Sequence, residues 1–174
     1  YHIIPDELKE IPEPSEYTQE NNEEHRVYLV DYDMVQANLL MVSNDGPMTL
    51  EIQPEATLFN DYFGFKMSSI VFQEIRESRG LAYSAAAIYS IPSRTDRNNF
   101  LIGFLGTQAD KLPEALNQMM KLFTDMPRAE KQFDLARQAI IKQIQTERIT
   151  NRGIYGAWMT NKDRGVDYDT RKDV

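Results

Sequence analysis

A guanidinium and a phenol lie seven residues apart in the stretch FQEIRESRGLAYS, residues 72–84. Arg76 falls in the last turn of a predicted helix, and Tyr83 follows the Gly80 turn that ends it. A helix-to-strand corner of this kind can bring both side chains to one spot. The guanidinium offers a permanent charge with several N–H donors, and the phenol offers one directed O–H. The alternative is an exposed cation near the helix C-terminus and a half-buried strand tyrosine.

Other catalytic chemistry finds little support in this sequence, which has no cysteine and two histidines, His2 and His25. A zinc site without cysteine usually takes two histidines from one helix face and a carboxylate. The NNEEH run resembles the end of an inverted His-x-x-Glu-His motif, but its first position is Asn21. A serine nucleophile at Ser68 has no histidine base. We therefore predict no metal and no cofactor in this chain.

The composition predicts one folded domain that binds no nucleic acid and does not span a membrane. The chain has 174 residues and a net charge of −8, and its basic residues alternate with acids, as in Arg94, Asp96 and Arg97. Phosphate-binding surfaces instead cluster lysine and arginine. No apolar run approaches the roughly 20 residues that span a bilayer. The N-terminus also shows no basic segment followed by an apolar one, so no signal peptide is predicted in this chain.

The hydrophobic pattern predicts a linker or surface-wrapping arm at residues 1–25, rich in Pro, Glu, Asn and Gln, and a domain at residues 26–174. In chain order the predicted elements are strands at 26–33 and 36–43, a turn at 44–47, helices at 54–63 and 69–79, strands at 82–90 and 98–107, and three helices, at about 112–123, at 129–149 and around 154–158. This order is typical of an α+β fold, a mainly antiparallel sheet with helices on one face. We expect the domain to be incomplete at its C-terminus.

Local signals predict how the helix at 69–79 begins and ends. Ser68 or Ser69 is placed to cap the first turn. Gly80 stands where a helix-ending glycine takes a positive φ, and Leu81 can close over the last turn. The small side chains at 82–87 predict that a helix or another backbone comes close to the following strand.

The stretch YFGFKMSSIVFQEIRESRGLAYSA, residues 62–85, resembles the C-terminal-type domain of the M16 metallopeptidases, the family of pitrilysin, insulin-degrading enzyme and the mitochondrial processing peptidases. The family pattern there is a glycine turn, Ser-Ser, a Leu/Phe-rich helix, Ile-Arg-Glu and Gly-Leu-Ala-Tyr-Ser. Two features depart from it. Only Gly64 remains of the glycine turn, and the family's His-x-x-Glu-His zinc motif is absent. The resemblance therefore implies a domain that holds no zinc.

The resemblance also implies the roles of Arg76 and Tyr83, which match an Arg–Tyr pair that faces the zinc across a closed chamber. Both side chains would donate hydrogen bonds to the substrate carbonyl or oxyanion in a zinc-dependent endopeptidase. This chain would be a fragment of that enzyme and would be inactive by itself. Zinc would come from another M16 domain in the same chain or on a partner subunit. The partners implied are a peptide or protein substrate and that zinc-bearing domain, in a bacterial periplasm or cytoplasm. The alternative is a catalytically inactive structural or peptide-binding module.

Overall fold

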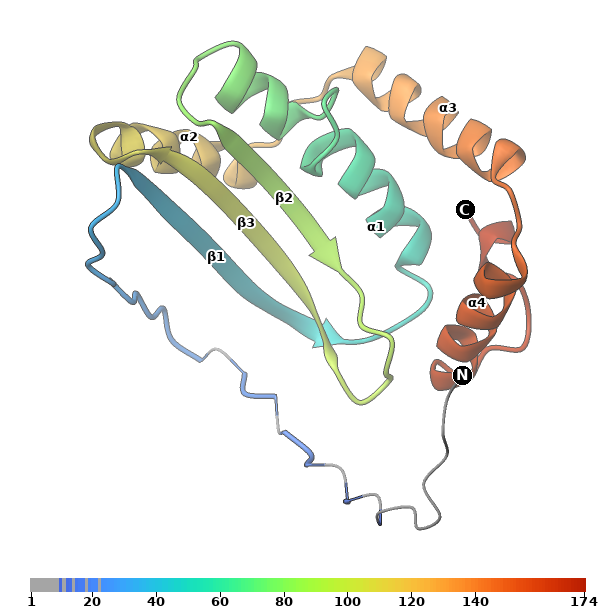
Figure 1. Ribbon diagram of the computed structural model, residues 1–174. Helices are drawn as coiled ribbons and strands as arrows, with labels where there is room; N and C mark the ends of the chain where they lie inside the picture. The colour runs from blue at the N-terminus through green and yellow to red at the C-terminus, as the bar shows by residue number, and fades with distance from the viewer. Residues whose placement is uncertain (1–9, 11, 14, 18, 22) are drawn as a thin grey trace, which may run out of the picture.

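Three antiparallel strands in the order β1-β3-β2 form the sheet that organises the chain (Figure 1). The computed structural model describes residues 10, 12–13, 15–17, 19–21 and 23–174. The strands are β1 (Gln36–Pro47), β2 (Ser84–Ser90) and β3 (Asn98–Gln108). Leu39 pairs with Leu105, which in turn pairs with Ala85, so β3 is bonded on both sides and β1 and β2 are edge strands.

Helices cover one face of this sheet, as the alternating pattern predicts (Figure 1). The helices of the chain are α1 (Gln53–Phe59), η1 (Asn60–Gly64), η2 (Phe72–Glu77), η3 (Ala109–Lys111), α2 (Leu112–Thr124), α3 (Glu130–Thr146), α4 (Asn151–Asp163) and η4 (Thr170–Lys172). Of these, α1, η1, η2 and α2 pack directly on the strands. The α+β architecture with helices on one face of an antiparallel sheet is confirmed. Within the part of the chain that the structure describes, no helix is long and apolar enough to cross a membrane.

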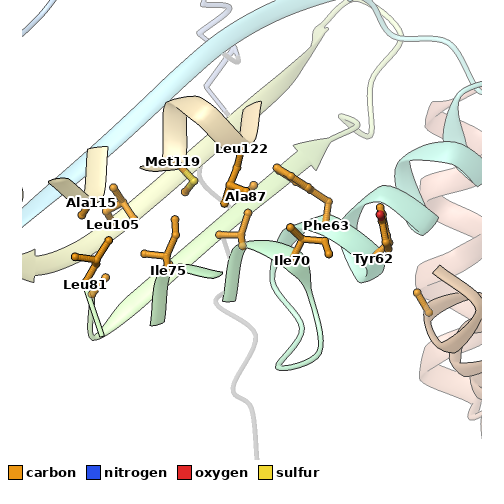
Figure 2. Packing of buried hydrophobic residues seen from close by; sticks show 14 residues of the cluster. Tyr62, Phe63, Ile70, Ile75, Leu81, Ala87, Leu105, Ala115, Met119 and Leu122 are labelled. Carbon is orange, nitrogen blue, oxygen red and sulfur yellow. The ribbon is translucent and has the colours of Figure 1, made fainter. Parts of the chain in front are cut away.

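The hydrophobic core lies between the sheet and the helices that cover it (Figure 2). Ala85, Ala87 and Leu105 supply the sheet side, while Ile75 of η2 and Met119 of α2 supply the helix side. The small strand residues allow the close approach predicted from their size. A β-carbon placed on Gly64 of η1 would lie 2.2 Å from the carbonyl oxygen of Ala87.

The predicted strand at 26–33 is wrong, because this segment pairs with no other strand among the described residues. Its apolar side chains are exposed, Leu29 at 93% and Val30 at 85%. Strand-forming residues make a ladder only where a neighbouring backbone supplies partners. The predicted turn at 44–47 is also wrong. Strand β1 continues through it with a register shift between Asn44 and Pro47.

The predicted helices and their ends are largely confirmed. The first runs through α1 into η1, and the second carries the expected buried stripe of Val71, Phe72 and Ile75. Both contain π-helical turns, at η1 and η2, which the 3.6-residue period does not predict. Ser69 caps the second helix, since its Oγ accepts a hydrogen bond from the backbone N–H of Phe72 at 3.4 Å.

The described part of the predicted N-terminal arm is held at one end of the sheet by polar contacts. Arg97 Nη1 donates to the carbonyl oxygen of Tyr17 at 2.5 Å, and the backbone N–H of Asn98 donates to Gln19 Oε1 at 2.8 Å. Much of the arm, residues 1–9, 11, 14, 18 and 22, lies outside the described residues. The predicted division into an arm and a domain at residue 26 stays a prediction.

Candidate functional site

Gly80 and Leu81 build the corner that carries Arg76 and Tyr83. Gly80 has a φ of +58°, the left-handed conformation that the sequence predicts there. Its N–H donates to the carbonyl oxygen of Arg76 at 3.0 Å, and the Leu81 N–H donates to that of Ile75 at 2.9 Å. Leu81 is buried, and its own carbonyl oxygen accepts a hydrogen bond from Thr107 Oγ1. The corner is therefore fixed by backbone bonds and by β3.

Arg76 lies in the last turn of η2 with 46% of its side chain exposed. Its guanidinium carbon lies 4.8 Å from the centre of the Phe72 ring, and Nε lies 3.8 Å from a carboxylate oxygen of Glu77. An ion pair of that length between two exposed side chains contributes little. The ring supports one face of the guanidinium and leaves its N–H groups available to an external acceptor.

Tyr83 is 54% exposed and stands directly before β2. Its backbone N–H donates to the carbonyl oxygen of Gly106 at 2.8 Å, which fixes the residue against β3. The phenol oxygen accepts a hydrogen bond from Gln108 Nε2 at 3.0 Å. Because Gln108 supplies the donor, the phenol keeps its own hydrogen for another acceptor.

Both predicted site residues thus present their polar groups at the surface beside one corner. No hydrogen bond or ion pair among the described residues joins Arg76 to Tyr83 directly. Gln108 is a functional candidate that the sequence reasoning missed. Only the pairing of Tyr83 with β3 points to Gln108. The Tyr83 N–H donates to the carbonyl oxygen of Gly106, and Gln108 lies two residues further along the same strand.

The described residues do not fit a zinc ion. They contain no group of three or more His, Cys, Asp or Glu side chains close enough to hold a metal. His25 is exposed, and His2 lies outside the described residues. Asn21 replaces the first ligand of the inverted motif, and its Oδ1 accepts hydrogen bonds from Asn44 and Asn98. The expectation that zinc is supplied from elsewhere stays a prediction.

A second polar cluster joins Tyr89 of β2 to Asp45 of β1 through a hydrogen bond of 2.5 Å between the phenol and the carboxylate. Burial, together with this bond, raises the pKa of Tyr89 to about 12, and the same bond lowers the pKa of Asp45. The pair connects the two edge strands across one end of the sheet. It stabilises the fold while both partners keep these protonation states, so we assign it a structural role.

Comparison with known proteins places the chain among the M16 domains. A solved structure, that of the peptidase M16 inactive domain from Pseudomonas fluorescens, superimposes with a TM-score of 0.68 at 17% sequence identity. The match covers 82% of this chain and 34% of the other, so this chain spans about a third of its solved relative. At that identity the likeness shows a shared fold. A search of the curated proteins found no match.

The family assignment rests on a sequence model. The model of the peptidase M16 inactive domain matches residues 4–140, most of this chain. The chain belongs to this family of M16 domains, which confirms the resemblance drawn from residues 62–85. Membership also favours a module that does not itself catalyse, the alternative left open from the sequence.

Proposed function

We propose that this chain is a non-catalytic M16 module that contacts an extended peptide through Arg76 and Tyr83. In an active peptidase it would complete a site whose zinc lies in another M16 domain, in the same chain or on a partner subunit. The observation that carries the proposal is the pair of polar groups beside one rigid corner. Arg76 has one long ion pair, and Tyr83 accepts from Gln108 while keeping its own hydrogen.

The chemistry available to this pair is hydrogen-bond donation to a peptide carbonyl oxygen. As a nucleophile adds to that carbonyl, negative charge grows on the oxygen. Donors already in position stabilise the charge without reorganising. Arg76 supplies a full positive charge, and Tyr83 supplies one O–H. The contact from Gln108 strengthens that O–H as a donor, because hydrogen bonds in a chain polarise one another.

A purely structural module is the second candidate, and the family's description as an inactive domain favours it. In that case Arg76 and Tyr83 would contribute only local packing. The long Arg76–Glu77 pair and the contact of Arg76 with the Phe72 ring are compatible with such a role. The two candidates differ in one respect, which is whether replacing these side chains changes peptide binding.

Binding of a phosphinate peptide to the isolated chain tests the proposal. The tetrahedral phosphinate carries a negative oxygen where the matched amide peptide has a neutral carbonyl, and the ratio of their Kd values is measured by fluorescence anisotropy. We expect the wild-type chain to prefer the phosphinate about tenfold. Arg76→Ala should remove most of that preference, because a hydrogen bond to a charged group contributes about 1.5–3 kcal/mol.

Arg79→Ala is the matched control for this measurement. Arg79 lies three residues further along, is 47% exposed, and forms a similarly long ion pair with Glu74 at 3.9 Å. Its replacement should leave the preference for the phosphinate within about twofold of wild type. If Arg76→Ala and Arg79→Ala lose the preference for the phosphinate equally, that preference comes from general charge attraction and not from a specific contact with Arg76. An unchanged preference in both variants would leave the structural candidate.

A further inference from the structure

The segment that leads into β1 has strand-forming side chains and a backbone without strand partners in this structure. Its large apolar side chains are all at least 75% exposed, namely Val27, Tyr28, Leu29, Val30 and Tyr32. Among the described residues, its backbone makes one hydrogen bond to another backbone group, from the N–H of Met34 to the carbonyl oxygen of Tyr32 at 2.7 Å. Exposed apolar side chains on an extended chain with free N–H and C=O groups favour pairing with a strand edge.

The free edge of β1 is the strand edge nearest to this segment along the chain. Strand β1 pairs with β3 on one side, and no strand among the described residues pairs with its other side. The arm also contacts the far end of β1, where Asn44 Nδ2 donates to Asn21 Oδ1 at 2.9 Å. From Asn21 to Gln36 the chain therefore runs from one end of β1 to the other, in the antiparallel direction (Figure 1).

The connection between the segment and β1 already turns. The backbone bends at Asp33 and at Val35, and the bond from the Met34 N–H spans the first bend. A loop over residues 33–36 would leave Tyr32 opposite Ala37. Hairpin loops of four residues are common and are usually built around one tight turn.

Such a loop also fixes the register of a hairpin, because each step back from Tyr32 is matched by one step forward from Ala37. Residues directly opposite each other lie on the same face of the sheet and contact each other. This register sets apolar side chains opposite apolar side chains at four successive positions, Val27–Val42, Tyr28–Met41, Leu29–Leu40 and Val30–Leu39.

The same register agrees with the two faces of the existing sheet. Leu39 and Met41 pack against the core from the helix side, so their new partners would extend that core. Asp31 falls opposite Asn38, which is exposed on the other face. A slip of one residue in either direction would turn Asp31 to the helix side and bring its carboxylate against apolar side chains, which is costly. One register is therefore favoured.

We propose that residues 26–32 close onto β1 as a fourth antiparallel strand, a strap that is open in this structure. Closure pairs the free edge of β1 and makes the strap the new edge of the sheet. That edge is short and is followed by Asp33, and short edges with charged residues resist pairing with other chains. The inference is drawn from β1 and the segment before it, so it does not rest on the proposed function.

Disulfide trapping tests the closed register, because the chain has no cysteine of its own. Leu29→Cys is combined with Leu40→Cys, since directly opposite residues are about 4.5–5.5 Å apart between their α-carbons, within the reach of a disulfide. The matched control combines Val30→Cys with Leu40→Cys, whose side chains would lie on opposite faces. All three positions are exposed, so the substitutions leave the core intact. Under oxidised glutathione, we expect the first pair to form an intramolecular disulfide about tenfold faster than the control pair, as measured by peptide mapping.

Hydrogen exchange of the strap amides gives an independent readout. Amides of the strap that bond to β1 should exchange about tenfold more slowly in the wild type than in Val30→Asp, whose carboxylate would face Leu39 in the closed form. Asp31→Asn, on the open face, should keep the slow exchange. Equal rates of disulfide formation in the two cysteine pairs would overturn the proposal. So would disulfides that form between molecules instead of within one, or exchange that is as fast in the wild type as in Val30→Asp.

Discussion

Tyr83→Phe should lower kcat and kcat/KM together, by on the order of 100- to 1000-fold, in a peptidase reconstituted from this chain and a zinc-bearing M16 domain. Loss of one prepositioned donor to a developing oxyanion typically has this effect. Both constants fall because the lost hydrogen bond forms mainly in the transition state, so the ground-state complex is little changed. Steady-state kinetics on a quenched fluorescent peptide measures the effect.

Thermal denaturation of the same variant separates a catalytic role from a structural one. The Tyr83 side chain is 54% exposed and its hydroxyl accepts a bond from Gln108, so its removal leaves no core cavity. The melting temperature should therefore stay close to that of wild type. Tyr155→Phe, at another exposed tyrosine, is the matched control and should keep both kinetic constants. Near wild-type kcat in Tyr83→Phe, with a melting point several degrees lower, would make Tyr83 structural.

Arg76→Lys should also fail to restore the rate in that assay, although it keeps the charge. The guanidinium stacks on the Phe72 ring at 4.8 Å and presents a planar set of donors, which a single ammonium cannot reproduce. Recovery of wild-type kcat by lysine would show that charge alone matters at this position.

Gly64→Ala should destabilise the fold by about 3 kcal/mol, the largest stability effect of a single methyl group that we expect here. The new β-carbon would lie 2.2 Å from the carbonyl oxygen of Ala87 and 3.3 Å from its carbonyl carbon. Both residues are buried, and Ala87 is held in the ladder between β2 and β3. A clash with backbone atoms cannot be relieved by rotating a side chain. The loss of folding free energy is therefore expected at the upper end of the range of about 1–3 kcal/mol that is typical of overpacking.

Gly46→Ala is the control for this substitution. Gly46 has no atom within 4 Å of the position that a β-carbon would take, and its φ is not positive. Its replacement should change the free energy of unfolding by less than about 0.5 kcal/mol. Gly64→Ala should melt on the order of 10 °C below Gly46→Ala for a chain of this size. Equal melting temperatures would mean that η1 can move away from β2 without cost.

The sequence predicted most of the helices and all three strands of the sheet, because their signals are local. Ser69, Gly80 and Leu81 define the start and end of one helix through neighbouring residues alone, and the structure bears out all three. Alternating small residues likewise predicted where helices approach β2. The corner of Arg76 and Tyr83 was predictable for the same reason.

The features that the sequence did not predict correctly depend mostly on contacts between residues that are far apart in the sequence. Residues 26–33 have strand-forming side chains, but whether they pair depends on a neighbouring edge that the segment itself does not encode. The π-helical turns of η1 and η2 cover only five and six residues, which is too short for the spacing of apolar side chains to distinguish them from an α-helix. Gln108 became a candidate only when the β2–β3 register placed it beside Tyr83.

The central claim is that this chain is a module without its own catalytic metal, and metal content measured together with peptide hydrolysis tests it most directly. The purified chain is dialysed, its zinc is determined by mass spectrometry, and hydrolysis of a quenched peptide is followed with and without a chelator. We expect less than stoichiometric zinc and no hydrolysis, because the described residues hold no metal-ligand cluster. One tightly held zinc per chain, with hydrolysis that the chelator abolishes, would contradict the account.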